Sequence, residues 1–242
     1  MFRFLLLLVV ALGATACVTT GHNKLPVPTS NKASNPSNLV SLNGKPFPLL
    51  SQVKKHKATV LAWWATQCPC VKRYQQRIEQ LKAQYSTQKV QVLAIASNAD
   101  DSPLVLWKNA VERRFQVPIL LDKNGQLARY LGVSSTPTVV ILDAEGKVRF
   151  FGWIDNERKP GESGRVAYAE DALKSLLQDQ PIGLSRAPFY GCTITRGFST
   201  QTKYQFVPDR LLADPNSMKL PQSKKVAKEK KRPAKPCACK KK

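Results

Sequence analysis

Cys68 and Cys70 stand two residues apart in the stretch Trp63-Trp64-Ala65-Thr66-Gln67-Cys68-Pro69-Cys70. The apolar run before them, residues 59–62, is typical of a buried strand, and the residues after them are typical of an amphipathic helix. Unpaired N–H groups and the helix dipole at a helix N-terminus stabilise a thiolate. Because the thiolate is the nucleophile and such positions lower cysteine pKa values from about 8.5 to roughly 3.5–7.5, this spacing predicts thiol chemistry.

Each of these two cysteines has a predicted role. We expect Cys68 to be the attacking or attacked sulfur, ionised and accessible at the start of its helix, with Lys72 and Arg73 as nearby cations. We expect Cys70 to release the mixed disulfide. A Cys68–Cys70 disulfide would close a very small ring, and strained disulfides are more oxidising. The alternative for Cys70 is a buried spectator in the first turn of the helix.

Four further cysteines complete the set of six: Cys17, Cys192, Cys237 and Cys239. Three interpretations of Cys192 stay open: it is free while Cys68 pairs with Cys70, it resolves a disulfide begun at Cys68 or Cys70, or it is structural. Three alternatives stay open for Cys237 and Cys239: they act as a mobile thiol shuttle, they bind a metal ion, or they have no function in the tail. If Cys17 is lipidated, the five remaining cysteines cannot all pair within one molecule.

The N-terminus, residues 1–17, reads as an export signal. Arg3 supplies a positive charge, residues 5–13 form an apolar core, and Ala14-Thr15-Ala16 is a small-residue cleavage site before Cys17. We expect Cys17 to carry a lipid, as in a bacterial lipoprotein, with ordinary cleavage as the alternative. Either outcome places the protein outside the cytoplasm, in the cell envelope or periplasm, where disulfides persist.

Two segments flank the core without a core-forming pattern. Residues 18–38 are rich in Thr, Ser, Asn and Pro and predict a flexible tether. Residues 219–242 carry eleven lysines and arginines against one acid, Glu229, and supply nearly half of the net charge of +22. This tail is predicted to be disordered, as a solubilising tail or as one that adheres to anionic lipid. We do not expect the protein to bind nucleic acid, because it is predicted to be exported and because its basic tail contains no aromatic residues.

Residues 39–180 are predicted to form one α/β domain, followed by an extension over residues 181–218 that contains Cys192. Strand-like runs alternate with amphipathic helical patterns, and a late hairpin follows. The economical arrangement is a central mixed sheet flanked by helices. The expected strands are 59–64, 90–96, 119–121, 138–142 and 147–151, and the expected helices begin near residues 69, 103, 126 and 168.

Four segments of this core resemble the thioredoxin superfamily, and more narrowly exported redoxin-domain proteins of the thiol-specific antioxidant and thioredoxin-like type. The resemblance covers roughly residues 39–194 and implies a thioredoxin-like fold. The segments are Trp64-Ala65-Thr66-Gln67-Cys68, Gly132-Val133-Ser134-Ser135-Thr136-Pro137-Thr138, Leu142-Asp143-Ala144-Glu145-Gly146-Lys147-Val148 and Gly191-Cys192-Thr193-Ile194.

The resemblance implies an exported thiol–disulfide oxidoreductase that acts on protein or small-molecule thiols and disulfides with an upstream electron donor or acceptor. It needs no cofactor. It further implies a cis Thr136–Pro137 bond beside Cys68 that presents backbone groups to an extended substrate, with Trp64 at the rim of the site. The catalytic set is then Cys68 and Cys70, with Cys192 as a possible third member.

Departures from the family pattern keep three alternatives open. Val71 stands where thioredoxins have their second cysteine, and Ala65 stands where peroxiredoxins have a threonine, which counts against a thiol peroxidase. Cys-x-Cys pairs suit soft ions such as Cu(I), which allows a metal-delivery module, although no zinc-type His/Cys spacing is present and no metal ligand set is assigned. The third alternative is a binding domain that has lost catalysis.

Overall fold

The computed structural model describes residues 39–156, 163–189, 191–195 and 205–213. The predicted export signal, tether and lysine-rich tail lie outside these residues, and so do three of the cysteines, Cys17, Cys237 and Cys239. Among the described helices, none is both long enough and apolar enough to cross a bilayer.

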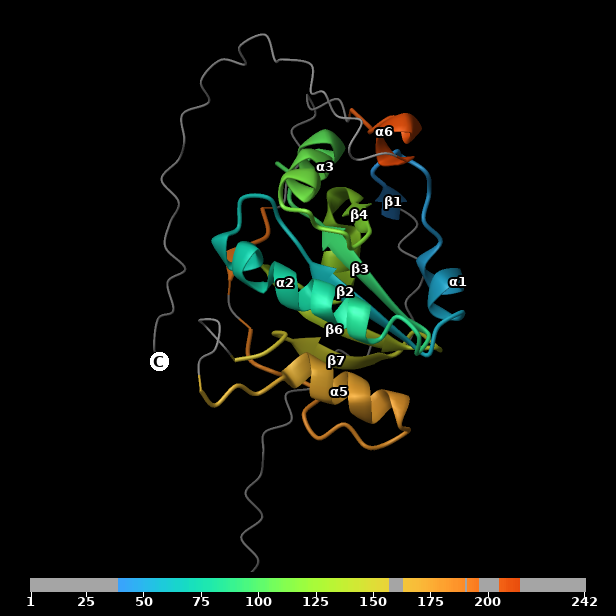
Figure 1. Cartoon of the computed structure of the whole chain (residues 1–242), viewed down its shortest axis with the longest axis vertical. Helices are drawn as coiled ribbons and strands as arrows, with labels where there is room; N and C mark the ends of the chain where they lie inside the picture. The colour runs from blue at the N-terminus through green and yellow to red at the C-terminus, as the bar shows by residue number, and fades with distance from the viewer. Residues whose placement is uncertain (1–38, 157–162, 190, 196–204, 214–242) are drawn as a thin grey trace, which may run out of the picture.

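A six-stranded mixed sheet forms the centre of the fold (Figure 1). Its strand order is β1-β4-β3-β2-β6-β7, in which β2, β3 and β4 run parallel and β1, β6 and β7 pair antiparallel to their neighbours. Two very short strands, β5 and β8, form a separate antiparallel pair. The strands are β1 (Leu39–Ser41), β2 (Ala58–Trp63), β3 (Val90–Ala96), β4 (Ile119–Asp122), β5 (Ser135–Thr136), β6 (Val139–Asp143), β7 (Val148–Gly152) and β8 (Cys192–Thr193).

The helices begin close to where the sequence pattern predicts. Ser102 caps α3 by accepting a hydrogen bond from the N–H of Val105 at 3.4 Å, and proline opens both α2 and α3. The helical elements are α1 (Leu49–Val53), α2 (Pro69–Gln84), α3 (Pro103–Glu112), the 3₁₀ turn η1 (Lys123–Gly125), α4 (Gln126–Tyr130), α5 (Tyr168–Leu177) and α6 (Asp209–Ala213). The predicted architecture, a mixed sheet flanked by helices, is confirmed.

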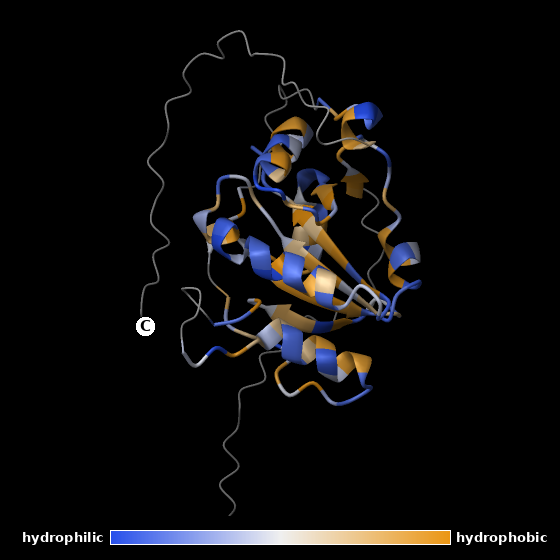
Figure 2. Ribbon diagram, viewed as in Figure 1, coloured by the Kyte–Doolittle hydropathy of each residue, from blue (hydrophilic) through white to orange (hydrophobic). Residues whose placement is uncertain are grey.

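The sheet separates two apolar cores. Side chains alternate along β2, so that Ala62 and Trp64 pack toward α2, α3 and α5, whereas Leu61 and Trp63 pack toward α1 and α4. Figure 2 shows the central strands in apolar colours over most of their length, whereas the helices alternate between polar and apolar residues. The two tryptophans before the cysteine motif therefore point into opposite cores.

The end of β2 is held on both sides, and this fixes where Cys68 begins α2. The N–H of Trp63 donates to the carbonyl of Thr138 at 2.8 Å, and the N–H of Trp64 donates to the carbonyl of Ile95 at 2.9 Å. The first bond ties β2 to the chain that follows the β5 segment. The cysteine motif and the Thr136–Pro137 loop are thus neighbours because of sheet geometry.

A buried ion pair joins α2 to the chain after β7. Arg77 Nη1 lies 2.6 Å from Asp155 Oδ1, and the Asp155 side chain is fully buried. Arg165 Nε approaches the other carboxylate oxygen at 3.2 Å. Removing one member of a buried pair leaves an uncompensated charge, which is the costly case for such pairs.

We therefore expect the Asp155→Asn variant to lose about 3 kcal/mol of unfolding free energy, because it removes the buried negative charge that Arg77 and Arg165 contact. Asp209→Asn is the matched control, since Asp209 forms an exposed ion pair with Lys45 at 2.9 Å. Urea unfolding monitored by tryptophan fluorescence measures both. Equal unfolding curves for the two variants would contradict this account of the ion pair.

Candidate active site

Cys68 lies at the N-cap of α2, as predicted, with Pro69 as the first helical residue. Its thiol donates a hydrogen bond to the carbonyl oxygen of Thr136, with a sulfur–oxygen distance of 3.3 Å. The side chain is only 2% exposed. The sequence predicted an accessible sulfur, and the structure corrects this point, because the segment that carries Cys192 lies across it.

The Thr136–Pro137 peptide bond is cis, which confirms the prediction for this loop. Thr136 ends β5, and its register partner across the antiparallel pair is Cys192 in β8. The Thr136 hydroxyl donates weakly to the carbonyl of Cys192 at 3.5 Å. One residue of the loop therefore contacts both Cys68 and Cys192.

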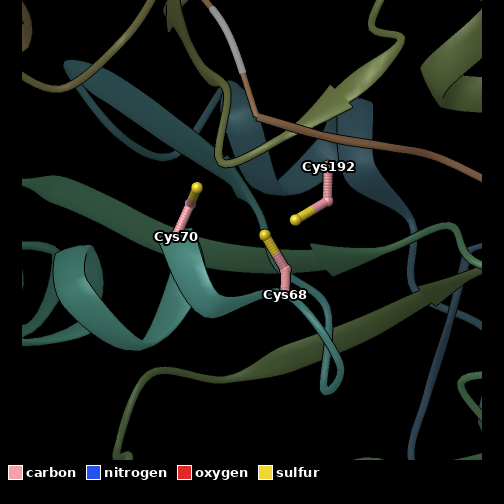
Figure 3. A group of neighbouring side chains, drawn as sticks. All are labelled: Cys68, Cys70 and Cys192. Atoms are coloured by element: carbon pink, nitrogen blue, oxygen red, sulfur yellow. The ribbon is translucent and has the colours of Figure 1, made fainter. Parts of the chain in front are cut away.

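Three sulfur atoms meet at this point. The sulfurs of Cys68, Cys70 and Cys192 all lie within 4.8 Å of one another. Figure 3 shows the side chains of Cys68 and Cys192 directed toward each other, with Cys70 on the first turn of α2. Cys68 and Cys192 are free thiols, whereas Cys70 is disulfide-bonded, to neither of these two. The Cys68–Cys70 disulfide, one of the pairings that the sequence left open, is therefore not formed in this structure.

Cys192 is held in its protonated form. Burial, a hydrogen bond with Cys68 and the charge of Cys68 together raise the pKa of the Cys192 thiol to about 12, while the backbone N–H of Cys70 acts in the lowering direction. At neutral pH Cys192 is therefore a thiol, and a thiol is not itself a nucleophile.

Arg113 is the cation that the structure brings into electrostatic contact with Cys68. Its Nη2 donates to the carbonyl of Thr66 at 2.8 Å, and its guanidinium lies 5.6 Å from the centre of the Trp64 ring. Burial lowers the Arg113 pKa, and the negative charges around it oppose that change. The predicted cations Lys72 and Arg73 are exposed on α2. Sequence reasoning missed Arg113 because it follows α3 and lies far from the motif along the chain.

Asp101 is a second residue that sequence reasoning missed. Its carboxylate accepts hydrogen bonds from the N–H and hydroxyl of Thr66 and from Asn98. Burial raises the Asp101 pKa, and these hydrogen bonds oppose the rise. The signal was available, since Asp101 follows β3 at the same sheet edge where Cys68 follows β2, and parallel strands bring their carboxyl ends together.

A small cavity of about 110 Å³ is lined in part by Cys68 and Cys192. By the volume of liquid water, about 30 Å³ per molecule, it has room for three or four waters. Its lining includes Gln67, Cys68, Asn98, Asp101, Cys192 and Thr195. A small reagent can therefore approach the cysteine pair, whereas a bulky one meets the segment that carries Cys192.

Trp64, which was predicted to touch substrate at the rim, is fully buried. Its ring stacks on Phe115 with a centroid separation of 5.4 Å. In this structure Trp64 is a core residue, and Thr136 is the predicted substrate-binding residue whose carbonyl contacts the sulfur of Cys68. Pro137 follows Thr136 in the same loop.

The three cysteines are also the group of ligating side chains that could hold a metal within the described part of the chain. Thiolates select soft ions such as Cu(I). Trigonal coordination with metal–sulfur bonds of about 2.3 Å requires sulfurs about 4 Å apart. A disulfide-bonded Cys70 cannot ligate as a thiolate, so such a site would form only after reduction.

Comparison with known proteins gives a consistent result. A family model described as Redoxin matches residues 23–169. The thiol-disulfide oxidoreductase ResA of Geobacillus thermodenitrificans is 30% identical over 145 residues, which cover 60% of this chain and 80% of that protein. ResA of Bacillus subtilis is also 30% identical over 145 residues, covering 60% and 78%.

Two solved structures share the fold. An uncharacterised conserved protein from Geobacillus kaustophilus has 29% identity and a TM-score of 0.59, and the match covers 66% of this chain and 87% of that one. A hypothetical protein from Sinorhizobium meliloti has 23% identity and the same TM-score, covering 66% and 90%. The second likeness shows the fold alone. Both matches show that these proteins share the fold of the described part of this chain, in which helices flank a mixed sheet.

The pKa of Cys192 generates a labelling prediction. With a pKa of about 12, Cys192 stays protonated at all pH values well below 12, so iodoacetamide labels it very slowly at pH 8 in the reduced protein. Replacing Cys68 with Ser removes both the charge and the thiol partner that raise this pKa, so labelling of Cys192 at pH 8 increases. Mass spectrometry of the alkylated peptides measures both rates.

Cys70→Ser is the control, because it keeps the backbone N–H that Cys70 directs at Cys192. This variant should leave the labelling rate of Cys192 unchanged. Labelling of Cys192 in the unsubstituted protein at the rate of an ordinary exposed cysteine would show that the two thiols are not coupled.

Proposed function

The chain belongs to the Redoxin family, and we propose that it is a thiol–disulfide oxidoreductase in which Cys68 attacks and Cys192 resolves. The observation that carries the proposal is the pair of free thiols, Cys68 and Cys192, directed toward each other with sulfurs within 4.8 Å. The relatives named ResA support the reaction type. These relatives do not indicate which cysteine resolves the mixed disulfide, and the assignment of that role to Cys192 is our own.

The reaction has two exchange steps. The Cys68 thiolate attacks a substrate disulfide, so that a Cys68–substrate disulfide forms and one substrate sulfur leaves as a thiolate. Cys192 then gives up its proton and attacks the Cys68 sulfur, which forms the Cys68–Cys192 disulfide and releases the second substrate thiolate. The substrate gains two electrons and the protein pair loses two. An external thiol donor restores the pair, and the reverse sequence oxidises a substrate dithiol.

Electrostatics order these two steps. Before the reaction, the hydrogen bond and charge of Cys68 are two of the three causes that keep the Cys192 pKa high. Once Cys68 is part of a mixed disulfide it carries no charge and no thiol hydrogen, so both causes disappear. The Cys70 N–H, which favours the Cys192 thiolate, remains in place. Cys192 therefore becomes easier to deprotonate at the step in which it must attack.

The loop before Pro137 contributes substrate contacts in this proposal. The carbonyl of Thr136 accepts the Cys68 thiol hydrogen in the resting state. Attack frees that carbonyl. We propose that Thr136 and Pro137 then contact the substrate, as the resemblance of this loop to the superfamily implies.

The predicted cellular setting belongs to the proposal as well. We propose an exported protein of the cell envelope or periplasm, held at the membrane by lipid on Cys17 and by the basic tail, and served by an upstream electron donor or acceptor. Cys17 and the tail lie outside the described residues. The six cysteines of the chain support an oxidising compartment.

Binding of Cu(I) is a second candidate function, and the observation that favours it is the cluster of three sulfurs. Titration of fully reduced protein with Cu(I) against a competing chelator measures it. One tightly bound ion that is lost in each single Cys→Ser variant would support a metal site, whereas no binding would remove this candidate.

The redox proposal predicts distinct outcomes for three single substitutions. Cys68→Ser abolishes reduction of a small disulfide such as hydroxyethyl disulfide. Cys192→Ser still attacks but accumulates the Cys68 mixed disulfide, because the resolving sulfur is gone. Cys70→Ser keeps multiple turnover. Stopped-flow turnover and intact mass of acid-quenched samples measure these outcomes.

Circular dichroism serves as the folding control for all three variants. Accumulation of the mixed disulfide in Cys70→Ser, with free turnover in Cys192→Ser, would instead identify Cys70 as the resolving cysteine. Turnover that survives Cys68→Ser would remove the proposal altogether.

A further inference from the structure

The segment Gly191–Thr195, which contains β8, lies along the edge of β5 directly over Cys68. Its pairs are Thr193 with Ser135 and Cys192 with Thr136. The N–H of Ile194 adds a hydrogen bond to the carbonyl of Ser134 at 2.9 Å, and the Ile194 side chain is buried. We call residues 191–195 the strap. Among the described strands, β8 is the one that pairs with β5.

The other end of the strap is held by the loop after β3. The N–H of Thr195 donates to the side-chain oxygen of Asn98 at 2.9 Å, and the N–H of Ala99 donates to the carbonyl of Thr195 at 3.0 Å. The strap therefore bridges the two loops between which the Cys68 sulfur lies. This position explains why Cys68 is only 2% exposed although it begins a helix.

Gly191 lets the strap approach this closely. A Cβ atom at this position would overlap the carbonyl oxygen of Thr136 and would lie 2.8 Å from its carbonyl carbon. No φ in the left-handed region is involved, so the requirement is for space alone. The backbone of the strap thus passes against the same carbonyl group that accepts the Cys68 thiol.

We infer that the strap occupies the edge at which an extended, cysteine-bearing peptide of a partner protein would bind, and that it competes with such substrates for Cys68. This inference rests on the proposed function. Without the strap, the backbone groups of residues 134–136 form an unpaired edge beside a reactive sulfur, which is the arrangement that adds a peptide as a further strand. Cys192 occupies the place of the substrate cysteine, and the resting pair imitates a bound substrate.

The competition has a chemical consequence for substrate class. Attack on a peptide disulfide forms the Cys68–peptide disulfide and releases the second half as a thiolate, with electrons balanced within the exchange. A small disulfide reaches Cys68 through the cavity of about 110 Å³ while the strap stays in place. An extended peptide needs the β5 edge itself. Displacing the strap should therefore favour peptide substrates over small ones.

The test compares Gly191→Ala with Gly183→Ala in the full chain carrying Cys192→Ser, so that only the first attack is measured. Gly183 is the matched control, because a Cβ at this position meets no atom within 4 Å. The probes are hydroxyethyl disulfide and a ten-residue peptide whose single cysteine is bonded to thionitrobenzoate. Release of thionitrobenzoate and formation of the protein adduct give second-order rate constants.

We expect Gly191→Ala to raise the ratio of the peptide rate to the small-disulfide rate by about tenfold, since it weakens backbone hydrogen bonds that the strap must give up for a peptide to bind. Gly183→Ala should leave the ratio unchanged. As an independent measure, Asn98→Ala loosens the other end of the strap and should change the ratio in the same direction. Thermal melts confirm that each variant is folded.

Two different failures are distinguishable. If Cys68→Ser reacts with hydroxyethyl disulfide as fast as the parent does, the proposed function fails. If the small-disulfide reaction depends on Cys68 but folded Gly191→Ala and Asn98→Ala leave the ratio unchanged or lower it, the strap does not compete with peptides and this inference is overturned.

Discussion

The site depends on one backbone carbonyl, that of Thr136. Its oxygen accepts a hydrogen bond from the Cys68 thiol, and Thr136 pairs with Cys192 in the two-stranded sheet of β5 and β8. The peptide bond that follows it is cis, and the carbonyl faces the thiol at the start of α2. Because the N–H of Trp63 is bonded to Thr138, two residues further on, the loop and the cysteine motif are held together by the sheet. The geometry of the sulfur pair is therefore a consequence of main-chain pairing.

Much of this arrangement could be predicted from the sequence. The apolar run before Trp64 and the spaced apolar residues after Cys70 fix a strand followed by a helix, and Pro69 fixes where that helix begins. The Thr-Pro step within a recognisable segment predicted the cis bond. These features are local, and local patterns of periodicity and turn chemistry report them directly. The opposite orientations of Trp63 and Trp64 also follow from strand geometry alone.

The remaining features are set by contacts between distant segments. Burial of Cys68 depends on the strap, which lies more than a hundred residues further along the chain, and no pattern around Cys68 indicates it. Arg113 contacts the site because α3 ends beside Thr66, which depends on how helices pack across the sheet. Asp101 combines a local and a distant feature. Its position after a parallel strand could be predicted from the sequence, whereas its hydrogen bonds with Thr66 could not. A short motif thus locates the reactive sulfur but not what controls it.

Control of the sulfur pair and cover of the site come from the same short segment. Cys192 needs the strap to approach Cys68, and that approach also shields Cys68 from a bulky partner. A resolving cysteine that acts within a small pair has to remain protonated until its neighbour is in a disulfide, and burial under paired backbone provides this condition. The same burial restricts the resting site to what fits its cavity. In the proposed mechanism, resolution by Cys192 and access of extended substrates are therefore opposing demands on residues 191–195. Gly191 favours resolution, because its lack of a side chain lets the strap lie against Thr136.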